Sequence, residues 1–152
     1  MLSLVFHMQL EPTHELVSGR LILLNDGKYL DTYLATSGVR EMQGRNAQDN
    51  SGLGPLPSCL ELGGKSYTVA TTPLNMPGVK GVEGNFYKIN PHLVSIWGRQ
   101  RGDFGIHRDA NLPGSAGCIV LTSVKGWDAF QQRMSAIAKS GVKELPLVVT
   151  YS

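Results

Sequence analysis

The chain of 152 residues is poor in cysteine and has no long hydrophobic run. Its two cysteines, Cys59 and Cys118, are too few for a disulfide framework, and the lack of a C-x-x-C pair argues against a structural zinc site. No run of about 18 apolar residues is present, so the sequence predicts no membrane-spanning helix. No repeat with a period of about 20–50 residues occurs, which excludes solenoid architectures.

Charge is also scarce. Charged residues make up 17% of the chain, and 14 Lys and Arg against 12 Asp and Glu leave a net charge of +2. Proteins that bind nucleic acid present a dense basic face, so this composition predicts no nucleic-acid partner. The first eight residues contain no Lys or Arg, and their apolar run is too short for an export signal. We therefore expect a protein that is cytoplasmic as synthesised.

Glycine, by contrast, is abundant, with 18 residues of 152 against a usual level of about 7%. Together with 8 prolines it indicates many turns and short strands, while 41% apolar residues predict a packed core. The chain length fits one domain of about 100–200 residues. We expect a single mostly β domain over residues 1–152.

Alternating apolar runs predict the strands. Residues 4–10, 21–24 and 29–36 form a meander, because Asp26-Gly27 between two apolar runs is typical of a type I′ hairpin turn. The polar residues 38–58 predict a long loop, either a flap over a substrate or a solvated connector. Further strands are predicted at residues 66–71, 86–89, 93–97, 103–107, 118–121 and 145–151.

One amphipathic helix is predicted after residue 123. Thr122 or Ser123 is suited to its N-cap, and Gly141 to its C-terminal stop. Three- and four-residue spacing places the apolar residues of this segment on one face. They are Val124, Trp127, Phe130, Met134, Ile137 and Ala138.

The chemistry concentrates between residues 104 and 121. His107 ends one predicted strand, Cys118 begins another, and a Gly- and Pro-rich loop joins them. A neighbouring imidazole can take the thiol proton and activate a cysteine nucleophile. Backbone N–H groups of the turn before Cys118 could stabilise an oxyanion, with Gly117 allowing close approach of a substrate carbonyl. A cysteine followed by Ile-Val-Leu is equally typical of a buried core strand.

Ile106-His107 followed by Ser115-Ala-Gly-Cys-Ile119 resembles the signature of L,D-transpeptidase catalytic domains, which have the YkuD-type fold. Residues 35–38, 54–57, 128–129 and 146–149 are similar in order to other segments of that family. The resemblance spans roughly residues 17–151. It implies a YkuD-like β-sandwich or barrel of mixed short strands, with one main helix packed after the Cys118 strand.

The resemblance also implies roles. Cys118 would be the nucleophile, His107 the general base, and the backbone of Gly117 and Cys118 the oxyanion hole, while Ser115 braces the turn or orients His107. The substrate would be a peptidoglycan stem peptide, attacked through a thioester at the cell wall or in the periplasm. An amine acceptor gives a crosslink and water gives trimming. No cofactor and no metal are required.

Two positions depart from the family pattern: Ala116 stands where a second His is usual, and Val120 where Arg or Asn is frequent. Two alternatives therefore stay open. One is an L,D-carboxypeptidase or endopeptidase, a murein hydrolase encoded by a phage or delivered as an effector. The other is a non-catalytic cell-wall-binding module. A third class, a zinc protein using Cys59, Cys118 and His107, would show bound metal.

Charged residues near His107 are candidate substrate ligands. Arg108 could pair with a substrate carboxylate in bidentate fashion, and Asp109 could orient the imidazole or pair with Arg108. Arg101 and Arg99 are further candidates on the preceding segment. Cys59 has no His nearby in sequence and is expected to be structural.

Overall fold

The computed structural model describes residues 1–11, 13, 15–51, 53–78, 84–108 and 114–152, and for residues 114–117 it describes the backbone alone. Over these residues the chain forms eleven strands, one α-helix and two short 3-10 helices. The strands are β1 (Leu2–Met8), β2 (Gly19–Asn25), β3 (Lys28–Val39), β4 (Tyr67–Ala70), β5 (Leu74–Met76), β6 (Gly84–Asn90), β7 (Leu93–Ile96), β8 (Arg99–Gly102), β9 (Gly105–Arg108), β10 (Gly114–Leu121) and β11 (Glu144–Tyr151); the helices are η1 (Arg45–Ala47), η2 (Cys59–Leu62) and α1 (Val124–Lys139).

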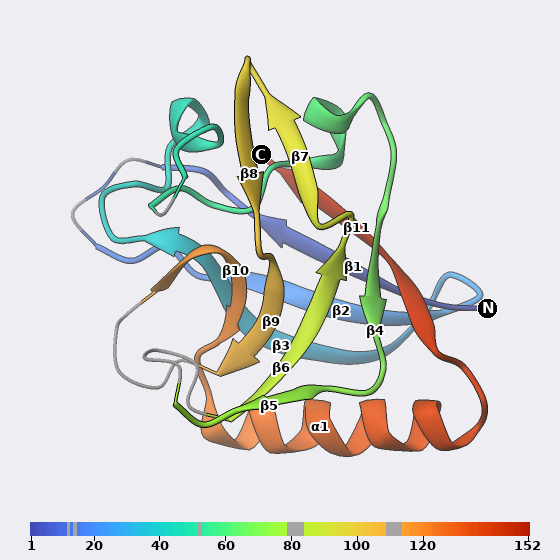
Figure 1. Cartoon of the computed structure of the whole chain (residues 1–152). Coiled ribbons are helices and arrows are strands. Elements are labelled where there is room, and N and C mark those ends of the chain that lie inside the picture. Colours follow the sequence, from blue (N-terminus) through green and yellow to red (C-terminus); the bar gives the residue numbers. More distant parts are fainter. Residues whose placement is uncertain (12, 14, 52, 79–83, 109–113) are drawn as a thin grey trace.

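Eight strands close into a barrel (Figure 1). Their order is β4-β11-β1-β2-β3-β10-β9-β6, and β6 pairs back onto β4. The β1–β11 and β9–β10 pairs are parallel and the other pairs of the barrel are antiparallel, so the barrel is mixed. Strand β5 pairs with the first residues of β6. The predicted mostly β fold with one main helix after the Cys118 strand is confirmed.

The predicted meander is confirmed, since β1, β2 and β3 pair antiparallel in chain order. Asp26 and Gly27 form the two-residue turn between β2 and β3, with φ of 50° and 80°. Positive φ at both positions is what a type I′ turn requires, and it matches the twist of the flanking strands. Alternate residues of the meander, such as Leu4, Leu21 and Leu23, then point into the barrel and are buried.

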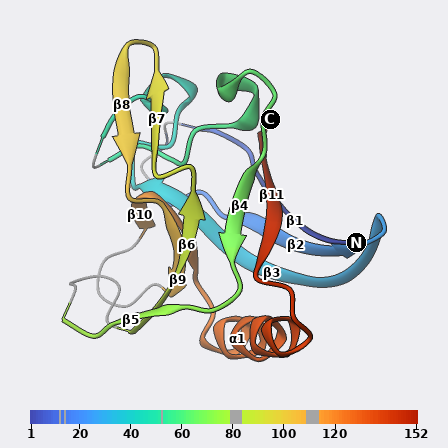
Figure 2. The ribbon, with the colours of Figure 1, turned by 45° about the vertical axis from the view of Figure 1, so that its right-hand side comes forward.

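Helix α1 lies across one end of the barrel, and the β7–β8 hairpin lies at the opposite end (Figures 1 and 2). The Ser123 hydroxyl accepts a hydrogen bond from the Gly126 N–H at 3.1 Å, which identifies Ser123 as the N-cap. Of the predicted apolar face, Trp127, Phe130, Met134 and Ile137 are buried. Val124 is 73% exposed. It is the first residue of α1, and the helix first packs against the core at Trp127.

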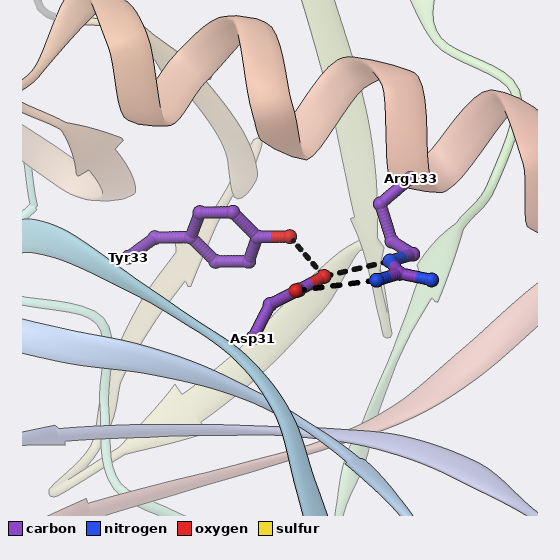
Figure 3. A network of polar contacts seen from close by, with 3 residues as sticks. All are labelled: Asp31, Tyr33 and Arg133. Atoms are coloured by element: carbon purple, nitrogen blue, oxygen red, sulfur yellow. Dashed lines mark hydrogen bonds and ion pairs between the residues drawn. The ribbon is translucent and has the colours of Figure 1, made fainter.

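A polar contact also joins α1 to the barrel (Figure 3). The Arg133 guanidinium of α1 donates hydrogen bonds to both carboxylate oxygens of Asp31 on β3, at 2.7 and 3.2 Å. The Tyr33 hydroxyl donates to the same carboxylate at 2.8 Å. These bonds, led by the one to Arg133, hold the pKa of Asp31 below its usual range. The pair is partly exposed, so it orients the helix more than it stabilises the fold.

The sequence did not predict strands β5 and β8, and the predicted strand 103–107 begins two residues later in the structure. Strand β5 lies between the predicted strands 66–71 and 86–89, and β8 lies before the predicted strand 103–107. That predicted strand is β9, which begins at Gly105. Asp103 separates β8 from β9 because its φ of 59° is left-handed and breaks the extended backbone.

Replacing Phe130 tests how far the helix depends on the barrel. Its ring meets the rings of Tyr33 and Tyr87 edge-on, with centroids 5.3 and 5.2 Å apart. We expect Phe130→Ala to lower the free energy of unfolding by about 3–5 kcal/mol in chemical denaturation. The exposed Val124→Ala is the matched control and should change it by less than about 0.5 kcal/mol. Equal effects of the two variants would contradict this packing.

Candidate active site

His107 and Cys118 lie on the same outer face of two neighbouring parallel strands. In the β9–β10 pairing, Ile106 is opposite Ile119 and His107 is opposite Val120. Ile106 and Ile119 belong to the main core inside the barrel. Side chains alternate along a strand, so His107, Cys118 and Val120 share the other face. Cys118 is thus diagonal to His107 on that face, one side-chain position away along β10.

An aromatic ring from β6 links the two residues. Phe86 stacks on the His107 ring, with centroids 5.9 Å apart, and it packs with Cys118 and Val120 in a buried cluster separate from the main core. Gly105 makes this arrangement possible, because a Cβ at that position would lie 2.0 Å from the Phe86 ring. The imidazole and the thiol therefore sit in one apolar environment on the outside of the barrel.

The environment of His107 keeps its imidazole neutral. The residue is 3% exposed, and its Nδ1 lies 2.8 Å from the Arg108 carbonyl oxygen. A carbonyl only accepts, so Nδ1 carries the proton and Nε2 carries the lone pair. Burial lowers the pKa of His107, while the hydrogen bond to Arg108 acts in the opposite direction. A neutral imidazole with a fixed tautomer is the form that acts as a base.

Cys118 lies in a distortion of β10. Ser115 pairs with Gly38 and Val120 with Thr36, so residues 116–119 lie opposite Ser37 alone. The Ser37 hydroxyl donates to the Cys118 carbonyl oxygen at 2.6 Å, and the Cys118 sulfur lies 3.8 Å from the Asp103 carbonyl oxygen. Bulges of this kind re-aim side chains and are frequent beside active sites. The sulfur is therefore held by backbone geometry as well as by packing, and Cys118 is 7% exposed.

The end of the long predicted loop supports the distorted part of β10 through Ser37. The Leu56 N–H donates to the Ser37 hydroxyl at 2.8 Å, and the Tyr151 hydroxyl donates to the Leu56 carbonyl. The Tyr67 hydroxyl donates to the Pro57 carbonyl at 2.6 Å. Residues 54–59 are all buried. Over these residues the segment is neither a substrate flap nor a solvated connector, because its backbone is bonded into the end of the barrel.

The predicted substrate ligands are placed in different parts of the molecule. Arg101 is 2% exposed, and its guanidinium donates to the carbonyl oxygens of residues 48, 54 and 55. Arg108 is exposed and pairs with Leu121 on β10, one position beyond the row that holds His107. Asp109 lies outside the residues that the structure describes. Ser115 and Gly117 are described by their backbone within β10.

Arg108 lines a groove at the start of α1. This groove has a volume of about 300 Å³ and is also bordered by Leu121, Thr122 and Trp127. It shares Asn85, Asp128 and Gln131 with a larger groove of about 920 Å³ that follows α1 toward Lys139. Both are bordered mainly by polar side chains. Strand alternation thus turns Arg108 away from the face of His107 and toward the helix.

The two cysteines of the proposed zinc site, Cys59 and Cys118, lie in different parts of the structure. Cys59 belongs to the main core, where its sulfur accepts a hydrogen bond from the Val149 N–H at 3.2 Å, whereas Cys118 belongs to the outer cluster. Among the residues that the structure describes, no three His, Cys, Asp or Glu are grouped as metal ligands. In the same part of the chain, no helix has the length and hydropathy needed to cross a membrane.

Sequence reasoning missed several residues that shape the site. Phe86 was expected only as part of a strand, and Gly105 and Asp103 carried no prediction of a role at Cys118. Their contacts depend on strand register, which has no local signal in the sequence. Ser37 did have one, since the segment 35–38 was noted for its similarity to a family strand that ends in Ser-x-Gly.

Comparison with known proteins adds no further information: no family model, curated protein or solved structure matches this chain. The assignment of this site therefore rests on its geometry and on the motif around His107 and Cys118.

The buried His107 should make stability depend on pH. Its pKa is lowered in the folded protein, so the unfolded chain binds more protons below its ordinary pKa of about 6.5. The free energy of unfolding should therefore fall as pH decreases from about 7.5 through 6.5 toward the folded pKa. Denaturation series at several pH values should show a smaller fall for His107→Gln.

His7→Gln is the control for this measurement, because His7 is an exposed residue of β1. This variant should keep the wild-type dependence on pH. If His107→Gln also keeps the full dependence, the imidazole is not desolvated in the folded state.

Proposed function

We propose that this protein is a cysteine-dependent acyltransferase or peptidase that acts on peptidoglycan stem peptides, in the manner of L,D-transpeptidases. The observation that carries the proposal is the placement of His107 and Cys118 on one face of the parallel β9–β10 pair. The motif that resembles the family lies on these same strands. The mixed barrel with one helix after β10 is compatible with the YkuD-like fold that the resemblance implies.

The first half-reaction forms a thioester. The Cys118 thiol transfers its proton to Nε2 of His107, and the thiolate attacks the carbonyl carbon of the L,D peptide bond. The new S–C bond forms and the C–N bond breaks. The leaving amine takes its proton from the His107 imidazolium, which returns the imidazole to its neutral form. The neutral tautomer set by the Arg108 carbonyl suits this cycle, because Nε2 starts with its lone pair.

The second half-reaction regenerates the thiol. An acceptor amine or a water molecule attacks the thioester carbonyl and gives its proton to His107, and the departing thiolate recovers a proton from the imidazolium. An amine gives a new amide and hence a crosslink, whereas water gives a carboxylic acid and hence a shortened stem. The substrate places this activity at the cell wall or in the periplasm.

Backbone donors would stabilise the tetrahedral intermediates. The proposed oxyanion hole uses the N–H groups of Gly117 and Cys118, which belong to the distorted part of β10. The Ser37 hydroxyl orients this backbone through the Cys118 carbonyl. Donors that are fixed before reaction stabilise the developing charge without reorganising, which is usually the largest electrostatic contribution to acyl transfer.

Hydrolysis is the second candidate, and one observation favours it over crosslinking. Val120, where the family often has Arg or Asn, is fully buried against Phe86 and Cys118. This position therefore offers no polar group to hold an acceptor stem. A non-catalytic cell-wall-binding module is a further alternative that the same experiment distinguishes.

The test is incubation of the full chain with purified muropeptides, followed by mass spectrometry. Dimers indicate crosslinking and shortened stems indicate hydrolysis. We expect either product with the wild type and with Cys59→Ala, whose thiol is buried in the main core. Cys118→Ala should give none, and His107→Gln should lower the rate by a factor of about 10²–10⁴.

Intact-protein mass spectrometry should also detect the acyl adduct on the wild type and on Cys59→Ala, but not on Cys118→Ala. Binding of muropeptides without any Cys118-dependent product would support the binding module instead. Absence of both binding and products would overturn the proposal.

A further inference from the structure

Arg101 carries a positive charge into the interior beside the candidate site. Its guanidinium donates to the carbonyl oxygens of Gln48 at 2.8 Å, Gly54 at 3.1 Å, and Pro55. Among the residues that the structure describes, no carboxylate forms an ion pair with it. Asp49, which attracts the Arg101 charge from a greater distance, pairs instead with Arg99 at 3.6 Å. Carbonyl dipoles solvate the cation without neutralising it, so its positive potential extends to neighbouring groups.

The Cys118 sulfur contacts backbone that is close in the chain to Arg101. It is 3.8 Å from the carbonyl oxygen of Asp103, two residues beyond Arg101, and the Arg101 guanidinium carbon is 5.7 Å from the centre of the adjacent Phe104 ring. Burial lowers the pKa of Arg101, whereas a negative charge on Cys118 raises it. Electrostatic coupling is reciprocal, so the guanidinium stabilises a Cys118 thiolate by the same interaction.

Arg101 is also mechanically connected to Cys118. Its guanidinium donates to the backbone of residues 48, 54 and 55. The next residue, Leu56, donates its N–H to the Ser37 hydroxyl, and Ser37 donates to the Cys118 carbonyl. A permanent cation is needed here more than in an exposed site, because the buried His107 resists becoming an imidazolium. An arginine keeps its charge under such conditions, whereas a lysine loses it more readily.

We propose that Arg101 is a positioning residue that stabilises the thiolate formed when Cys118 gives its proton to His107, rather than a ligand of the substrate. Its significance rests on the proposed function, but its effect on the thiol is measurable without any substrate. In the part of the chain that the structure describes, the charged or titratable groups around Arg101 and Cys118 include His107 on β9, Asp103 before it, Asp49 beside η1, Tyr67 on β4 and Tyr151 on β11. Ser37, Met76 and Phe86 face the pair from β3, β5 and β6 without charge.

The experiment measures the pKa of the Cys118 thiol in a Cys59→Ala background, so that one thiol is observed. Thiolate absorbance near 240 nm and the rate of alkylation by iodoacetamide are followed against pH. Burial and the Asp103 carbonyl act to raise the thiol pKa, so the inference is tested by the difference between the wild type and the Arg101 variants. Arg101→Gln should raise the thiol pKa by about one unit or more, which lowers the alkylation rate at pH 6 about tenfold. Arg101→Lys, which retains a charge, should give a smaller rise.

Tyr151→Phe separates charge from mechanical support. It removes the hydrogen bonds of the Tyr151 hydroxyl with the Leu56 carbonyl and with Ser37, and leaves Arg101 in place. This variant should lower the free energy of unfolding while the thiol pKa stays unchanged. A rise in the thiol pKa as large as that of Arg101→Gln would show that loop support, and not charge, is responsible, and would overturn the inference.

Asp49→Asn gives the opposite shift and serves if Arg101→Gln does not fold. Removing this carboxylate leaves Arg101 less neutralised, so the thiol pKa should fall by a few tenths of a unit. An unchanged or raised pKa in Asp49→Asn, or an unchanged pKa in Arg101→Gln, would overturn the inference.

A thiol pKa that depends on Arg101 without turnover of muropeptides would refute the proposed function alone, and turnover with a thiol pKa independent of Arg101 would refute this inference alone.

Discussion

The parallel pairing of β9 with β10 is the constraint on which the candidate site depends. It places Ile106 beside Ile119 inside the barrel and leaves His107, Val120 and Cys118 on the outer face. Because side chains alternate along each strand, a slip of one residue would move His107 into the core and an isoleucine to the outside. The hydrophobic demand of the barrel interior thus also sets the relative position of the imidazole and the thiol.

Buried polar groups convert this register into a defined local geometry. Ser37 connects the Cys118 carbonyl to the Leu56 N–H, and Arg101 and Tyr151 fix the backbone on either side of that contact. Such a network is costly to bury unless its members are satisfied. It therefore defines one arrangement of the distorted strand.

Local patterns in the sequence were sufficient for several elements. Asp26-Gly27 predicted the hairpin turn, and the spacing of Trp127, Phe130, Met134 and Ile137 predicted the helix and its buried face. The predicted strand 103–107 begins only at Gly105, because the left-handed backbone of Asp103 interrupts the extended chain. The pattern of apolar residues does not reveal this interruption. Residues 54–58 were predicted to be part of a flap or a solvated connector, because a polar composition says nothing of the barrel groups that satisfy a buried backbone.

The sequence by itself determined which side chains are available for chemistry, namely His107 and Cys118 at the two ends of a Gly- and Pro-rich segment, and it determined the class of fold. The tertiary structure decided which other residues contact these two side chains. Phe86 on β6 and the carbonyl of Asp103 contact Cys118 from segments distant in the chain. The physical reason is that periodicity and turn propensity are local properties, whereas barrel closure, strand register and burial of charge depend on contacts between distant segments.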